Sequence, residues 1–128
     1  MSAAGFAGAC AFAPVWERAL GDCMDRLAVP AGANLGFLYF SDRYTDDAEN
    51  LFAAVREETA VEHWVGSVGI GVIGADQAHL GRAGMSMLVG CFPAGSFRVF
   101  SGRAPLRADK DGEEPYFAVV HGDPRTED

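Results

Sequence analysis

Apolar residues recur at helical spacing in two stretches of this chain. The first stretch predicts a helix over Pro14–Ala28, because proline is favoured in a first turn and a Pro-Ala-Gly segment follows shortly after the stretch ends. The second predicts a helix capped by Asp46, with Glu49 three residues later as in a capping box. The apolar positions of the two stripes are Trp16, Leu20, Cys23, Met24 and Leu27, and Ala48, Leu51, Phe52 and Val55.

Strand patterns occupy most of the remaining chain. Leu35–Phe40 is a continuous apolar run, which is typical of a strand buried on both faces. From His63 onward the predicted strands are Trp64–Val68, Ile70–Ile73, Met85–Phe92, Phe97–Phe100 and Tyr116–Val120, and a Pro-Ala-Gly-Ser turn makes the third and fourth a hairpin. These elements predict an α/β fold of the mixed α+β kind: a mixed, largely antiparallel sheet from about residue 63 onward, with two main helices packed on it.

The length of the chain, 128 residues, is sufficient for one hydrophobic core, so we expect residues 1–128 to form a single domain. Residues 102–115 are polar and rich in charge, and predict a surface loop. The predicted strand Tyr116–Val120 allows two arrangements. It lies either in the centre of the sheet or at an edge, where an apolar strand pairs readily with another chain.

Acidic side chains outnumber basic ones, with 18 Asp and Glu against 10 Lys and Arg and a net charge of −8. Nucleic acids and anionic membrane surfaces are bound through clustered Lys and Arg, so we expect neither partner. No apolar run approaches the roughly 18 residues needed to span a bilayer. Three cysteines, Cys10, Cys23 and Cys91, show no metal or disulfide spacing, which favours a cytoplasmic location.

The segment Gly69–Gly74 matches the dinucleotide-binding pattern G-x-G-x-x-G. In that fold a helix begins at the motif and an acidic residue follows about 20 residues later. Here Ala75–Gly84 has no apolar helical stripe, and the first acidic residue after Asp76 is Asp109. We therefore interpret these glycines as a tight turn between two strands.

Several of these strand and glycine patterns carry a family resemblance. Gly66–Gly74, Gly84–Leu88, Phe92–Gly95, Leu38–Ser41 and Phe117–Pro124 together resemble the N-terminal region of the FIST family. The resemblance implies an intracellular, often bacterial, sensory domain in signal transduction that binds a small ligand, with amino acids suggested. One subgroup resembles haem-binding nitric oxide sensors. The chain lacks the usual second half of the family's domain, so we expect it to be the N-terminal part.

Candidate ligand-binding residues lie where predicted strands end, because ligands of α/β sheets gather at the carboxyl ends of parallel strands. Backbone N–H groups of the glycines can receive a carboxylate, serine hydroxyls can orient the ligand, and an aspartate can receive an ammonium group. An alternative for the serine and aspartate that follow Leu35–Phe40 is turn or cap chemistry. The candidates are Ser41, Asp42, Gly66, Ser67, Gly69, Gly71, His121 and Asp123.

No motif in the chain predicts an enzyme. A Ser or Cys nucleophile needs a neighbouring base, and no G-x-S-x-G elbow occurs. We therefore expect a noncatalytic small-ligand sensor without a bound cofactor or metal. One alternative is a haem b sensor, for which a single histidine such as His121 is sufficient as axial ligand. Another is a protein-interaction module, which binds a signalling partner or a second copy through the final strand.

Overall fold

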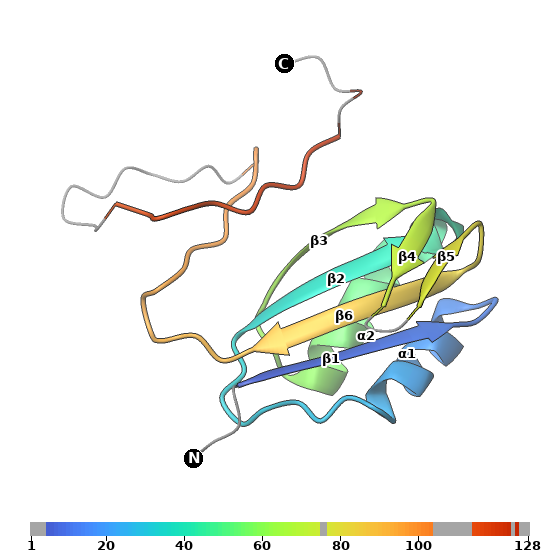
Figure 1. Ribbon diagram of the computed structural model, residues 1–128, viewed down its shortest axis with the longest axis horizontal. Helices are drawn as coiled ribbons and strands as arrows, with labels where there is room; N and C mark the ends of the chain where they lie inside the picture. Colours follow the sequence, from blue (N-terminus) through green and yellow to red (C-terminus); the bar gives the residue numbers. More distant parts are fainter. Residues whose placement is uncertain (1–4, 75–76, 104–113, 124, 126–128) are drawn as a thin grey trace.

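The computed structural model describes residues 5–74, 77–103, 114–123 and 125 (Figure 1). Helices and strands alternate along the first part of the described chain, and strands alone follow. The elements are β1 (Phe6–Phe12), α1 (Trp16–Met24), β2 (Leu35–Ser41), the 3-10 helix η1 (Asp42–Asp47), α2 (Ala48–Thr59), β3 (His63–Gly69), β4 (Gly71–Ile73), β5 (Ala78–Leu80) and β6 (Gly84–Gly90).

Four strands form one mixed sheet in the order β1-β6-β2-β3, and β4 and β5 form a separate hairpin. β6 runs antiparallel to both of its neighbours, whereas β2 and β3 are parallel and are joined through α2. Both helices lie on one face of the sheet, and the hairpin lies across one end of the opposite face, called here the outer face (Figure 1). Two helices and a mixed, mostly antiparallel sheet confirm the predicted α+β class.

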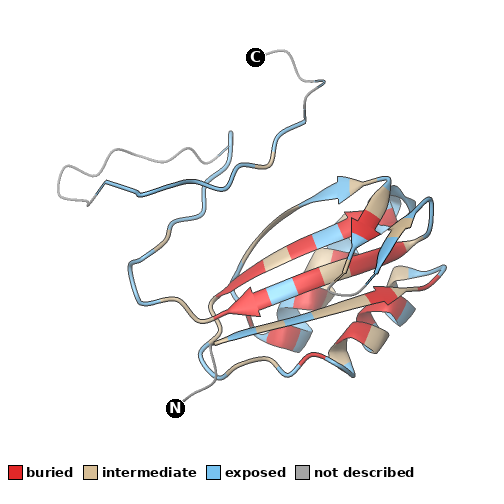
Figure 2. Cartoon of the chain, viewed as in Figure 1, coloured by how far each residue is buried: buried red, intermediate tan, exposed pale blue. Residues whose placement is uncertain are grey.

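The core lies between the sheet and the helices, because alternate residues of each strand point toward the helical side. Figure 2 shows the buried positions concentrated on the sheet and on the helix faces that meet it. Fully or almost fully buried residues of this layer are Ala11, Leu20, Cys23, Leu38, Phe40, Leu51, Val55, Met85, Met87 and Val89. The apolar stripes of the two predicted helices therefore face one shared core.

Two of the predicted strands are wrong. Phe97–Phe100 forms no strand. β6 pairs with β1 along one edge and with β2 along the other, so it has no free edge for the second strand of the predicted hairpin. Tyr116–Val120, called here the exposed C-terminal segment, pairs with no strand of the described chain, and Phe117 within it is 81% exposed. In contrast, Phe6–Phe12 is a strand that the sequence pattern does not predict.

The helix boundaries differ from those predicted. α1 is shorter than the predicted helix at both ends and begins at Trp16. α2 begins at Ala48 and follows η1 directly, and its N-cap residue Asp47 makes no side-chain cap hydrogen bond. The predicted cap at Asp46 is therefore wrong, because Asp46 lies within the 3-10 turn.

Two further sequence predictions concern the surface and membranes. Of the predicted charged loop, residues 104–113 lie outside the described residues, and the flanking Arg103 and Glu114 are exposed. Among the residues that the structure describes, no helix is both long enough and apolar enough to cross a membrane.

Candidate functional site

The predicted ligand residues Ser41 and Asp42 lie where β2 ends and η1 begins. Ser41 pairs with Gly69 of β3 and is 1% exposed. Its Oγ accepts a hydrogen bond of 3.2 Å from the backbone N–H of Gly84, at the start of β6. Asp42 is exposed and begins η1. Ser41 therefore ties β2 to β6, and a contact of either residue with a ligand stays a prediction.

The predicted glycine site is a tight connection between β3 and β4. A Cβ atom at Gly66 would lie 1.7 Å from the carbonyl oxygen of Leu38, so only glycine fits where β2 and β3 approach. A Cβ atom at Gly71 would lie 2.8 Å from the carbonyl oxygen of His79 in the hairpin. No helix begins in the segment 69–74, which confirms the strand-turn-strand interpretation. Anion binding by these backbone N–H groups stays a prediction.

Tyr39 connects two of the remaining candidates on the outer face. Ser67 lies beside Tyr39 in the β2–β3 pairing, and the Tyr39 hydroxyl shares a hydrogen bond of 2.9 Å with Nε2 of His121. Asp123 lies two residues beyond His121, but its carboxylate binds the Arg125 guanidinium at 2.8 Å and 3.0 Å. That hydrogen bonding lowers the pKa of Asp123 to about 2. Asp123 is therefore engaged by Arg125, and an ammonium ligand would have to compete with it.

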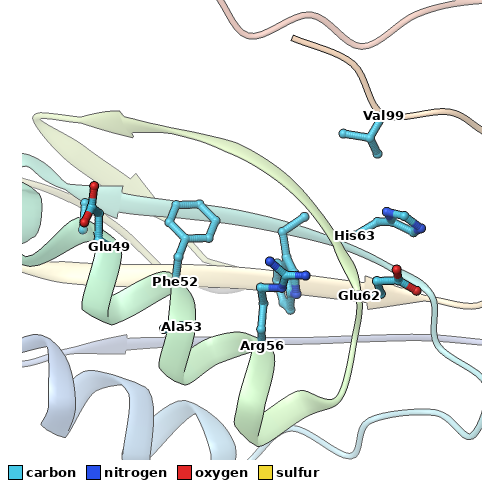
Figure 3. A pocket seen from close by; sticks show the side chains of 9 residues that line it. Glu49, Phe52, Ala53, Arg56, Glu62, His63 and Val99 are labelled. Carbon is cyan, nitrogen blue, oxygen red and sulfur yellow. The ribbon is translucent and has the colours of Figure 1, made fainter. Parts of the chain in front are cut away.

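A groove that the sequence does not predict lies between α2 and β3. We call it the α2–β3 groove, and its volume is about 640 Å³. Figure 3 shows side chains of α2 along one side, the start of β3 on the other, and Val99 above His63. Its lining residues are Ala48, Glu49, Phe52, Ala53, Arg56, Glu62, His63, Trp64 and Val99.

Local packing places the aromatic residues of the groove. Phe52 of α2 packs edge-on against Phe40 of β2, with ring centroids 6.2 Å apart. Trp64 of β3 lies over Gly36 of β2, where a Cβ atom would come within 2.5 Å of the indole ring. The indole Nε1 donates a hydrogen bond of 2.9 Å to the carbonyl of Val61. Both rings are half-buried and belong to the edge of the core.

A row of contacting aromatic rings determines the position of the segment that carries Val99. Phe6 of β1 contacts Phe92 after β6, Phe92 contacts Phe97, and Phe97 contacts His63, with ring centroids 5.4, 5.7 and 5.6 Å apart. The chain after β6 therefore passes the start of β3, where His63 faces both this row and the groove.

The groove presents charges of both signs. Arg56 projects from α2 between Phe52 on one side and Glu62 and His63 on the other (Figure 3). Within the described part of the chain, Arg56 has no ion-pair partner, and Glu49 and Glu62 are exposed. The groove therefore offers a guanidinium, an imidazole and two carboxylates around an aromatic surface.

The predicted haem alternative does not fit His121. An axial ligand needs an imidazole nitrogen aimed at the iron of a haem seated in a cleft. Nε2 of His121 instead faces the Tyr39 hydroxyl, and the histidine that lines the α2–β3 groove is His63. Among residues 5–74, 77–103, 114–123 and 125, no three His, Cys, Asp or Glu side chains gather as they would around a metal ion.

Sequence reasoning missed the groove because its lining comes from separate elements. One signal was available: Glu49, Phe52 and Arg56 follow one another at helical spacing, so they share one stripe of α2. The residues across the groove, around Glu62 and at Val99, are joined to that stripe only by packing.

Comparison with known proteins gave one finding. A family model described as the FIST N domain matches residues 34–127. No curated protein and no solved structure matches the chain. The matched range includes α2, β3 and the exposed C-terminal segment, and excludes β1 and α1.

Proposed function

Because the chain belongs to the FIST N domain family, a predicted sensory signalling domain, we propose that it is a noncatalytic sensor of a small zwitterionic metabolite. The α2–β3 groove is the proposed site, and an amino acid or a close relative is the proposed ligand class. The observation that carries this proposal is the placement of Arg56 among acidic and aromatic side chains in one groove.

The chemistry of the groove is complementary to an amino acid. An arginine guanidinium binds a carboxylate through two parallel hydrogen bonds, and this one has no ion-pair partner in the described part of the chain. Glu49 and Glu62 are acceptors for an ammonium group. Phe52 and Trp64 provide apolar area for a side chain. A volume of about 640 Å³ lies within the range of small-molecule sites.

A noncatalytic role is part of the proposal. Among the residues that the structure describes, the groove lining contains no Ser, Thr, Cys or Lys side chain to act as a nucleophile. Its charged groups are surface-exposed side chains, which suit reversible binding of a polar ligand.

The test is calorimetric titration with three ligands that share one side chain: the amino acid, the amine without its carboxylate, and the carboxylic acid without its ammonium group. Phenylalanine, phenethylamine and 3-phenylpropionate form such a set. We expect the amino acid to bind best. Arg56→Gln should weaken binding of the amino acid and the acid roughly ten- to hundredfold, because a charge-assisted hydrogen bond is lost.

The matched control is Arg18→Gln, which removes an exposed arginine of α1 outside the groove. It should leave all three affinities unchanged. A thermal-shift screen of a panel of amino acids and small acids extends the test to ligands with other side chains. If no member of the panel binds the folded chain, or if both arginine variants behave alike, the proposed site is wrong.

A further inference from the structure

β3 is an edge strand whose sequence contains none of the residues that usually prevent pairing with another strand. In the described part of the chain, the order β1-β6-β2-β3 leaves one side of β3 without a partner strand. Natural edge strands are commonly protected by charged residues, above all lysine, or by proline, but His63–Gly69 contains no Lys, Arg, Asp, Glu or Pro. At the opposite edge, Nη1 of Arg26 donates to the carbonyl of Cys10 and so places a cation beside β1. β3 is therefore the more open of the two edges.

The exposed C-terminal segment has the composition of a strand, and it pairs with no strand in the part of the chain that the structure describes. Its sequence, Tyr-Phe-Ala-Val-Val, consists mainly of aromatic and β-branched residues, which favour sheets. Its chain continues into His121, which is held by Tyr39, while the segment itself runs clear of the four-stranded sheet (Figure 1) and is exposed along its length (Figure 2). The matched family range includes this segment as well as β3, so both belong to the FIST N domain.

We infer that the exposed C-terminal segment of one copy adds as a strand to the β3 edge of a second copy. Each chain carries both the donor segment and the acceptor edge, so two copies exchange segments reciprocally around a two-fold axis. Neither element contains Asp, Glu, Lys or Arg, so no fixed charge is desolvated when they pair.

We expect the exchanged strands to bury the area of a standard interface. Two aromatic side chains bury roughly 300–500 Å². When the segment and the surface it covers are counted in both copies, the total is about 1,200–2,000 Å², which is the standard size of a specific interface. Because each chain carries a net charge of −8, added salt should strengthen the dimer by screening the repulsion between copies.

The experiment is sedimentation velocity on the full chain over a wide range of protein concentrations. The wild type should show a concentration-dependent monomer–dimer equilibrium. Phe117→Lys charges the donor segment, and Ser67→Lys, at an exposed position of β3, places a lysine on the acceptor edge. Each should weaken the dimer by at least about tenfold. Leu80→Lys charges an equally exposed apolar residue of the hairpin and should leave the dimer unchanged.

Mixing the two variants identifies the pairing. Ser67→Lys keeps an intact donor and Phe117→Lys keeps an intact acceptor, so the mixture should associate more strongly than either variant alone. A wild-type chain that stays monomeric overturns the inference. So does a dimer that survives Ser67→Lys, because the segments would then pair with each other. Thermal unfolding verifies that each variant folds, and neither Phe117 nor Ser67 lines the α2–β3 groove, so ligand binding is tested separately.

Discussion

Replacing Gly36 with alanine tests the packing that places Trp64 in the α2–β3 groove. Gly36 lies in β2 directly opposite Trp64 of β3. An added Cβ atom would lie 2.5 to 2.6 Å from three carbon atoms of the indole ring, well inside van der Waals contact. The ring must therefore move, although its Nε1 is tied to the carbonyl of Val61.

The expected cost follows from two opposing effects. Alanine restricts the unfolded chain more than glycine does, which stabilises a protein by about 0.4–1 kcal/mol where the site is compatible. Overpacking at a closely packed site costs about 1–3 kcal/mol. The clash at Gly36 is with a large ring, so the cost of overpacking should exceed the gain from alanine. The net loss in the free energy of unfolding should be about 1–2 kcal/mol. For a chain of 128 residues this lowers Tm by roughly 3–10 °C.

The assay is thermal and urea unfolding, together with indole fluorescence. The control is Gly21→Ala in α1, where a Cβ atom meets nothing within 4 Å, and which should stabilise the chain by about 0.5–1 kcal/mol. In a Trp64→Leu background the cost of Gly36→Ala should disappear, because the clashing ring is gone. A Gly36→Ala chain as stable as the wild type, with unchanged fluorescence, would refute this account of the groove.

Two further predictions concern buried polar groups. Burial, with a smaller contribution from Cys10, raises the pKa of the Cys23 thiol from 9.0 to about 12. The stabilisation that comes from keeping this thiol neutral in the folded state is therefore fully present below pH 9. It is lost as the pH rises toward 12, by up to about 1.4 kcal/mol per pH unit, because the thiol of the unfolded chain ionises first. Urea unfolding should show a smaller alkaline loss for Cys23→Ala than for the wild type, and equal losses would contradict this assignment. Ser41→Ala should cost about 1–3 kcal/mol in urea unfolding, because the buried N–H of Gly84 loses its acceptor. A loss of ligand affinity at unchanged stability would instead make Ser41 a ligand contact.

Local periodicity was a reliable guide where one face of an element had to be buried. The stripe through Leu51 and Val55 becomes the buried face of α2, and the apolar run Leu35–Phe40 becomes β2. The glycines of 69–74 form a strand connection as predicted, since no helical stripe follows them. These features depend on the spacing of neighbouring residues and so are readable without knowledge of the fold.

Strand pairing was the point at which local pattern failed. Phe6–Phe12 is rich in alanine and glycine, which are depleted in strands, yet it pairs with β6 because α1 can pack closely on its small residues. Phe97–Phe100 has strand composition but no place beside β6, because β6 already has a neighbour on each side. Tyr116–Val120 also has strand composition and pairs with no strand of the described chain, although one side of β3 is open. A strand needs a free edge, and which edges are free depends on the order of the whole sheet.

The candidate site, like the fold, was predictable from the sequence only in part. The order of the predicted elements was sufficient to predict the α+β class, and the resemblance was sufficient to predict the FIST N domain, because both follow from patterns along the whole chain. The predicted ligand residues were those that follow strands. In the sheet Ser41 lies beside Gly69, and Tyr39 lies beside Ser67 and shares a hydrogen bond with His121. The α2–β3 groove joins Arg56, Trp64 and Val99 from three separate segments. Their proximity is produced by the packing of α2 on β2 and by the aromatic row that carries the chain past β3, and no local spacing encodes those long-range contacts.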